Sequence, residues 1–430
     1  MAKMGTWQGA AVSIGAVLGT GVIALPALAA QTAGPASLVA WLVLIALSAP
    51  LAATFAALGA RHPDAGGVST YVRRAFGRRP AAMVGWWFYF AVAVGAPPAA
   101  LFGGAYVAAA FGGGTRTALI TAAATIVVVT LANTFGVQVS GRVQLALAGL
   151  LILLLLTATG FALPHAHWSN LSPFAPHGWF AIGPAAAVLV WGFAGWEAVT
   201  HLAADFRDPA RQLPRATAIA AVVVGVLYFA VAATSVLVLG AATGSSEAPL
   251  AELLAIGVGG PVRVVTAGAA LLLTIGTMNA YFAGAAKLGS ALGRDGALPG
   301  WLARGSRAGG VPRRSLAVVA LLAASALGVV ALAGSHTRVL VLMTTGSFVL
   351  VYVLGTAAAL RLLPRRSWSR RCAGVAFVSV VGLLVLTGWY VLWAVGVALA
   401  ALAYDHLAHR RQPTLVPAMS AELVDCGQPS

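Results

Sequence analysis

Long uninterrupted runs of apolar residues follow one another along the chain, and short segments between them hold most of the charged residues. About 20 apolar residues in a helix cross the hydrocarbon core of a bilayer. By that measure the runs predict membrane-spanning segments over residues 7–30, 37–60, 81–111, 117–135, 141–163, 179–203, 217–243, 262–286, 315–334, 338–360 and 372–405. The last run is too long for one helix, and Gly388 offers a turn within it, so we expect two short helices there and twelve in all.

Composition supports a polytopic all-α membrane protein. Of the 430 residues, 60% are hydrophobic and 8% are charged, and the mean hydropathy is +0.91. An ordinary soluble domain carries about a quarter charged residues, so one soluble core could not bury this much apolar surface. The lipid bilayer is therefore the expected solvent of this chain.

The net charge of +16 indicates topology and gives no sign of a nucleic-acid partner. With the N-terminus placed inside, 23 of the 26 Lys and Arg residues fall on the cytoplasmic side, and only Arg116, Arg263 and Arg338 fall outside. That bias follows the positive-inside rule and puts both termini in the cytoplasm. A cleaved signal peptide is the alternative interpretation of the first 30 residues, but its removal would invert this bias.

Two apolar runs are interrupted near their middles, at Gly19-Thr20-Gly21 and at 192–195. Each break lies in the first segment of a five-segment half, which is typical of inverted-repeat transporters whose site lies where the two unwound backbones meet. Close helix packing through small residues is the alternative for either break alone. We therefore expect four parts: a first repeat over 1–163, a second over 164–361, a helical hairpin over 362–409 and a disordered cytoplasmic tail over 410–430.

The breaks suit a zwitterionic ligand. The half-helix after Gly21 presents free N–H groups to a carboxylate, and the preceding half-helices end in carbonyl groups suited to an ammonium. An α-amino acid carries both groups. Apolar residues close to the breaks predict a pocket for an uncharged side chain, with Phe193 as the candidate gate; they are Ile14, Trp86, Trp87, Trp191, Phe193 and Trp196.

Glu197 is the one acidic residue, of ten, that lies well inside an apolar segment. A carboxylate there is costly unless it is paired, protonated or faces a cavity, so a functional role is the default interpretation, against a purely structural hydrogen bond. His201 and Asp205 follow at i+4 and i+8 and would share its face. That stripe is either a proton path or a hydrogen-bonded helix interface.

The sequence does not support metal binding, nucleotide binding or catalysis. His165, His167 and His177 have a metal-like composition but lack acidic and cysteine partners, so we expect no metal. Nucleotide-binding motifs and nucleophile-base constellations do not occur in the sequence. We expect neither an enzyme nor a cofactor.

Four motifs in order resemble the amino acid/polyamine/organocation transporter superfamily; they are "GAVLGTGVIALPALAAQTAG", "HPDAGGVSTYVRRAFG", "FAGWEAVTHLAADFRDPARQLPRA" and "KLGSALGRDGALPGWLARGSRAGGVPRRSL". Within it the first and third are most similar to bacterial exporters of methionine and branched-chain amino acids. The resemblance implies a five-plus-five inverted repeat with two extra helices in a bacterial inner membrane. It also implies that Gly19, Thr20 and Gly21 bind the carboxylate, that Phe193 and Ala194 line the amino-group side, and that Glu197 serves proton coupling. The spacing of the stripe adds His201 as a second candidate for that coupling. Residues 143–163 contain no lysine, unlike some proton-coupled relatives.

The resulting hypothesis is a secondary transporter that exports methionine, leucine, isoleucine and valine by alternating access, in exchange for protons. An importer or exchanger of the same superfamily is the first alternative, because these motifs do not determine the direction of transport. A non-transporting membrane sensor is the second. The sequence leaves the oligomeric state, and sodium in place of protons, open.

Overall fold

The computed structural model describes residues 4–62, 67–136, 141–197, 200, 203, 206–304, 311–334 and 337–410. Within these ranges the chain is helical, apart from loops and one isolated bridge between Met4 and Phe206. The helices, with η for 3-10 helices, are α1 (Thr6–Val17), η1 (Thr20–Ile23), α2 (Leu25–Ala33), η2 (Gly34–Ala36), α3 (Ser37–Arg61), α4 (Gly67–Phe76), α5 (Arg78–Phe111), α6 (Gly114–Thr134), α7 (Gly141–Ala162), η3 (Leu163–His165), η4 (Trp168–Leu171), η5 (Trp179–Ala181), α8 (Ile182–Phe193), α10 (Pro209–Leu239), η7 (Gly240–Ser245), α11 (Pro249–Val258), α12 (Val262–Arg294), η8 (Gly300–Ala303), α13 (Arg313–Ala333), α14 (Thr337–Leu362), α15 (Trp368–Thr387), η9 (Gly388–Tyr390) and α16 (Val391–Arg410).

Nine helical stretches in the described part of the chain are long and apolar enough to cross a membrane. Two of them each contain two α-helices joined by a 3-10 turn: α2 and α3 in Leu25–Arg61, and α15 and α16 in Trp368–Ala408. In the second, α15 ends at Thr387 and Gly388 follows with φ +63°, a conformation that favours glycine. The integral membrane class expected from the hydropathy is thus confirmed.

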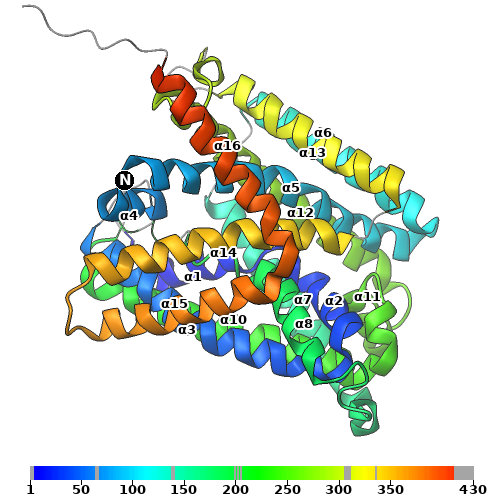
Figure 1. Cartoon of the computed structure of the whole chain (residues 1–430). Coiled ribbons are helices and arrows are strands. Elements are labelled where there is room, and N and C mark those ends of the chain that lie inside the picture. The colour runs from blue at the N-terminus through cyan, green and yellow to red at the C-terminus, as the bar shows by residue number, and fades with distance from the viewer. Residues whose placement is uncertain are drawn as a thin grey trace, which may run out of the picture.

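The helices pack around a central pair. α5 and α14 lie side by side and are the most buried of the long helices, and α12, α13 and α6 continue from α5 along one side (Figure 1). On the other side α10 packs against α3 and α1. The peripheral helices expose large apolar side chains, such as Leu332 of α13 and Val385 of α15, which suit contact with lipid tails.

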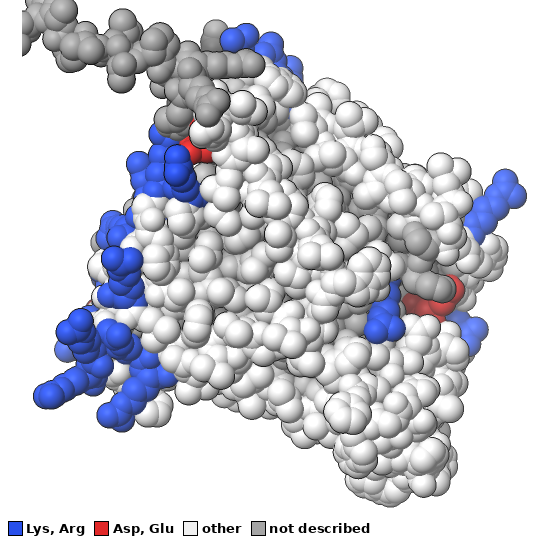
Figure 2. Space-filling view, in the orientation of Figure 1, with Lys and Arg blue, Asp and Glu red and all other residues white. Residues whose placement is uncertain are grey.

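Charge is gathered at two opposite ends of the molecule. Figure 2 shows most Lys and Arg side chains along the left edge and upper left, a few at the right, and a broad uncharged band on the face between them. At the more basic end Arg78 and Arg79, at the start of α5, lie 3.6 and 3.2 Å from the Asp405 carboxylate of α16. We refer to this end, where α5 begins and α12 finishes, as the basic end.

The helices differ from their predicted extents mainly at the basic end. α12 continues to Arg294 instead of stopping near 286, because its last turns are amphipathic and its hydrogen bonding ends only before Gly296, with φ +71°. α4 and α11, which the apolar runs did not predict, are too short to cross a bilayer. The tail was predicted over 410–430, but Arg410 is the last residue of α16, and 411–430 lie outside the described residues.

Candidate functional site

The two predicted breaks lie against each other in the interior. α1 ends at Val17, and Gly19 adopts an extended conformation before η1 begins at Thr20. α8 ends at Phe193, and Gly195 follows with φ +130°. A Cβ placed on Gly195 would lie 2.7 Å from the carbonyl oxygen of Ala16, so only glycine permits this crossing of the backbones.

Tyr228 of α10 joins the two broken helices. Its hydroxyl oxygen lies 3.0 Å from the carbonyl oxygen of Val17 and 2.9 Å from that of Gly192, and it donates to both acceptors. The side chain is fully buried. Two of the carbonyl groups left at the ends of α1 and α8 are therefore already in contact with a hydrogen-bond donor from the protein.

The start of η1 offers hydrogen-bond donors. The N–H groups of Thr20 and Gly21 begin the 3-10 helix, where no earlier carbonyl of that helix can accept them, and no side chain caps it. Gly21 also makes room for Trp191, because a Cβ there would lie 2.9 Å from the indole ring. This helix start can thus receive a carboxylate beside an aromatic wall.

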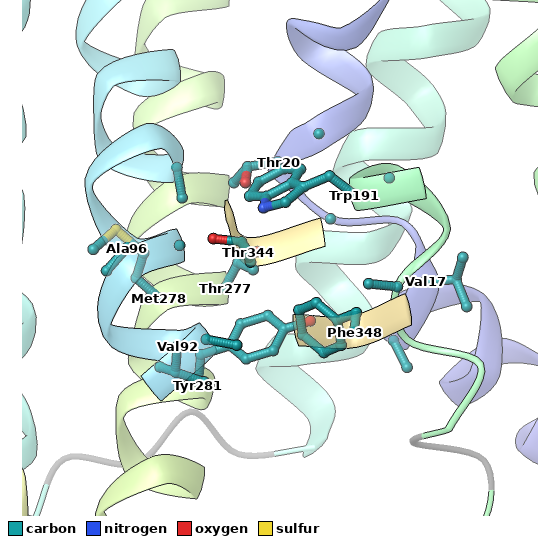
Figure 3. Close-up of a pocket in the computed structure, with 18 of the residues that line it drawn as sticks. Val17, Thr20, Val92, Ala96, Trp191, Thr277, Met278, Tyr281, Thr344 and Phe348 are labelled. Atoms are coloured by element: carbon teal, nitrogen blue, oxygen red, sulfur yellow. The ribbon is translucent and has the colours of Figure 1, made fainter. Parts of the chain in front are cut away.

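A small cavity of about 70 Å³ lies next to this helix start. In Figure 3 Thr20 and Trp191 lie above it and Tyr281 and Phe348 below it, with Thr277 and Thr344 between. The other lining residues are small or apolar: Ala16, Val17, Gly19, Gly21, Ala91, Val92, Gly95, Ala96, Ala99, Gly192, Ala194, Met278 and Phe282. Among the described residues, the lining contains hydroxyl groups, the Trp191 indole and backbone but no charged side chain.

A larger cavity of about 590 Å³ lies on the side of Tyr281 and Phe348 that faces the basic end, and both rings line it as well. Glu197 also lines it, with 5% of its surface exposed. One oxygen of that carboxylate accepts hydrogen bonds from the Gly195 N–H at 2.9 Å and from the Tyr352 hydroxyl of α14 at 2.5 Å. The carboxylate thus ties the second break to the central helix α14.

The structure brings part of the predicted site together. Gly19, Thr20, Gly21 and Ala194 line the small cavity. Neither cavity's lining includes Ile14, which is half-buried against the core. His201 lies outside the described residues.

Phe193 does not line either cavity. Its ring packs on Trp41 and Tyr228, with centroid distances of 6.0 and 5.3 Å. Two helical steps of about 100° turn Phe193 to the face opposite Trp191, so Trp191 occupies the position in the cavity where we expected an aromatic gate. Trp86 and Trp87 likewise use their indole N–H groups elsewhere, on the carbonyl groups of Ala297 and Ala394.

The sequence analysis missed the contributions of α5, α12 and α14. Thr277 and Tyr281 are four residues apart on α12, as are Thr344 and Phe348 on α14, so each pair shares one helix face. A hydroxyl or aromatic residue at i,i+4 in an apolar helix is a weak signal, because such residues also bond to their own backbone, as Thr344 does at 2.8 Å to Leu340.

Comparison with known proteins identifies the class of this fold. The amino acid permease family model matches residues 4–405, nearly the whole described chain. The chain therefore belongs to the amino acid permease family and is a membrane transporter, not an enzyme.

Its relatives include proteins of assigned and unassigned substrate. The chain is 34% identical to the L-methionine/branched-chain amino acid exporter YjeH of Escherichia coli, over 91% of this chain and 93% of that protein. It is 33% identical to the uncharacterized amino acid permease YecA of Bacillus subtilis, over 93% and 94% of the two chains. The branched-chain amino acid permease BcaP of Bacillus subtilis is 24% identical over 70% of this chain and 69% of its own length.

Proposed function

We propose that this permease exports neutral, apolar L-amino acids, with methionine, leucine, isoleucine and valine as substrates, in exchange for protons. The single observation that carries the proposal is the small cavity at the crossing of the two breaks. It combines helix-start N–H groups with an uncharged, largely apolar lining. The similarity to the exporter YjeH supports both the substrate class and the direction.

The cavity chemistry favours neutral over charged side chains. The N–H groups of Thr20 and Gly21 would receive the carboxylate, and carbonyl groups near Ala194 the ammonium. Met278, Val92 and Phe348 would contact the side chain. A cationic or anionic side chain would lose its hydration there without gaining an opposite charge, which costs several kcal/mol.

Glu197 is the proposed proton-coupling residue. A carboxyl group inside a membrane protein takes up a proton when its surroundings are dry and releases it when water reaches it. Glu197 lines the larger cavity and holds the Gly195 N–H, so its protonation would act directly on the second break. His201, four residues after Glu197 in the sequence, is the second candidate residue for proton coupling.

The proposed architecture follows from the helix order. Counting α1 with α2 as the first span and α8 with the residues after it as the sixth gives twelve spans, the last two being α15 and α16. The inverted repeats would comprise 1–163 and 164–361, followed by the hairpin over 362–409. The basic end would face the cytoplasm of a bacterial inner membrane, by the positive-inside rule.

Counterflow in liposomes that contain the purified protein tests the proposal. Labelled methionine and leucine should accumulate, faster under a pH gradient, whereas arginine and glutamate should not. Accumulation of arginine would contradict the apolar cavity as the site, and no counterflow of any of the four would contradict the substrate class.

An importer is the second candidate, favoured by the similarity to the permease BcaP. Growth of cells that overproduce the protein separates the two directions. An exporter should confer resistance to toxic leucine or methionine analogues, and an importer should confer sensitivity.

A further inference from the structure

The larger cavity extends from the breaks toward the basic end. Its lining includes Ser69 of α4, Gly85 in the first part of α5, Gln144 in the first turn of α7 and Lys287 in the last part of α12. Each of these residues lies in the basic-end portion of its helix or between helices at that end. The cavity is thus an antechamber between the small cavity and the basic end.

The antechamber has the size of a ligand site in its own right. Its volume of about 590 Å³ falls within the range of small-molecule pockets, roughly 300–1,000 Å³. The two cavities meet at six shared lining residues, of which Tyr281 and Phe348 carry the aromatic rings; the others are Ala16, Gly19, Val92 and Thr277. A solute that comes from the basic end therefore meets the antechamber before it meets the small cavity.

Two charged side chains line the antechamber, Glu197 and Lys287. One carboxylate oxygen of Glu197 already accepts two hydrogen bonds from the protein. Lys287 is exposed and is the only cation among the described residues of the lining. It lies six residues beyond Tyr281 on α12, about 9 Å farther along the helix axis at 1.5 Å per residue.

We propose that the antechamber is a separate entry site for amino acids, in which Lys287 binds the α-carboxylate before the substrate passes Tyr281 and Phe348. This proposal rests on the proposed function and adds to it a second binding step, which occurs only at the basic end. An ammonium group binds a carboxylate through a charge-assisted hydrogen bond. Ser69 and Gln144 supply further polar contacts, and the apolar walls, such as Leu273 and Phe88, suit the same side chains as the small cavity.

Membrane vesicles of opposite orientation test the entry site. Inverted vesicles present the cytoplasmic face to labelled methionine, and right-side-out vesicles present the outer face. Lys287→Met keeps most of the side-chain length and removes the charge, Lys287→Arg keeps the charge, and Lys287→Gln repeats the removal if the Met variant does not accumulate. Arg313→Gln, at the start of α13 outside the cavity lining, is the matched control for general surface charge.

The expected result is one-sided. Lys287→Met should raise the apparent KM at the cytoplasmic face roughly fivefold or more, the effect of losing one charged hydrogen bond in a partly solvated site. The outer-face KM, Lys287→Arg and Arg313→Gln should stay close to wild type. An unchanged cytoplasmic KM, an equal rise at both faces, or the same rise in Arg313→Gln would overturn the entry site while the wild-type flux still supports the proposed function. Absence of saturable flux in wild-type vesicles would refute both.

Discussion

Replacing Gly195 with alanine tests whether the two breaks cross as closely as the structure shows. The residue has φ +130°, a region that side chains disfavour by about 1–3 kcal/mol. The added Cβ would also lie 2.7 Å from the Ala16 carbonyl oxygen and 3.2 Å from the Val17 Cα. Because both neighbours are backbone atoms, they cannot turn aside as a side chain would, and overpacking of this kind costs about 1–3 kcal/mol more. The variant should therefore be destabilised by about 2–6 kcal/mol in all.

Gly160→Ala provides the matched control. Gly160 lies in α7, and a Cβ there meets nothing within 4 Å, so alanine should be neutral or raise stability by roughly 0.5 kcal/mol. The assay is thermal unfolding of both purified variants in detergent, followed by methionine counterflow after reconstitution. Gly195→Ala should melt well below Gly160→Ala and give the counterflow of empty liposomes. A Gly195→Ala protein as stable and as active as the control would refute the close crossing.

Three further substitutions test two groups at the site, Glu197 and Tyr228, and one group outside it, Arg74. Glu197→Gln should abolish the dependence of flux on the pH gradient while leaving substrate exchange, and a variant whose counterflow still responds fully to the gradient would exclude Glu197 as the coupling residue. Tyr228→Phe removes the donor shared by the two broken helices and should lower stability by about 1–3 kcal/mol in thermal unfolding, whereas Tyr404→Phe, whose ring packs on an aromatic neighbour near the basic end, should not. The pKa of His62 is lowered by burial and by the guanidinium groups beside it, Arg74 lying 3.1 Å away, so Arg74→Gln should raise that pKa and reduce the stability lost on acidification below about pH 6.5. Titration of the imidazole signal by NMR measures that shift, and an unchanged pKa would show that Arg74 does not contribute to it.

Much of the fold could be predicted because lipid imposes a simple rule on sequence. A spanning helix must satisfy its own backbone and present apolar side chains, so apolar runs give its existence and approximate extent. The ends were less predictable, as α12 shows, because this helix continues past its last apolar turn through Lys287 to Arg294, where the hydropathy no longer marks it. Short helices such as α4 and α11 lack the length that makes a run conspicuous.

The candidate site was predictable where glycine marks it and unpredictable where tertiary contacts make it. Gly21 and Gly195 showed the breaks because each allows a close approach that other residues prevent. The pairing of Glu197 with Tyr352, 155 residues away, depends on how α8 and α14 pack, which no local pattern encodes. Phe193 lies at a break but packs on Trp41 and Tyr228, because closeness to a break does not determine which way a side chain points.

The Tyr228 hydroxyl has one proton and two acceptors, the carbonyl groups of Val17 and Gly192. If one of these carbonyl groups moves away, the Tyr228 hydroxyl still has an acceptor, because it can donate its hydrogen bond entirely to the other carbonyl. Separation of α1 from α8 would then cost a redistribution of one hydrogen bond and not the 1–3 kcal/mol of an orphaned buried donor. The shared hydroxyl thus lowers the free-energy cost of moving the two broken helices relative to each other. Two separate hydrogen bonds, one to each helix, would make that movement more costly.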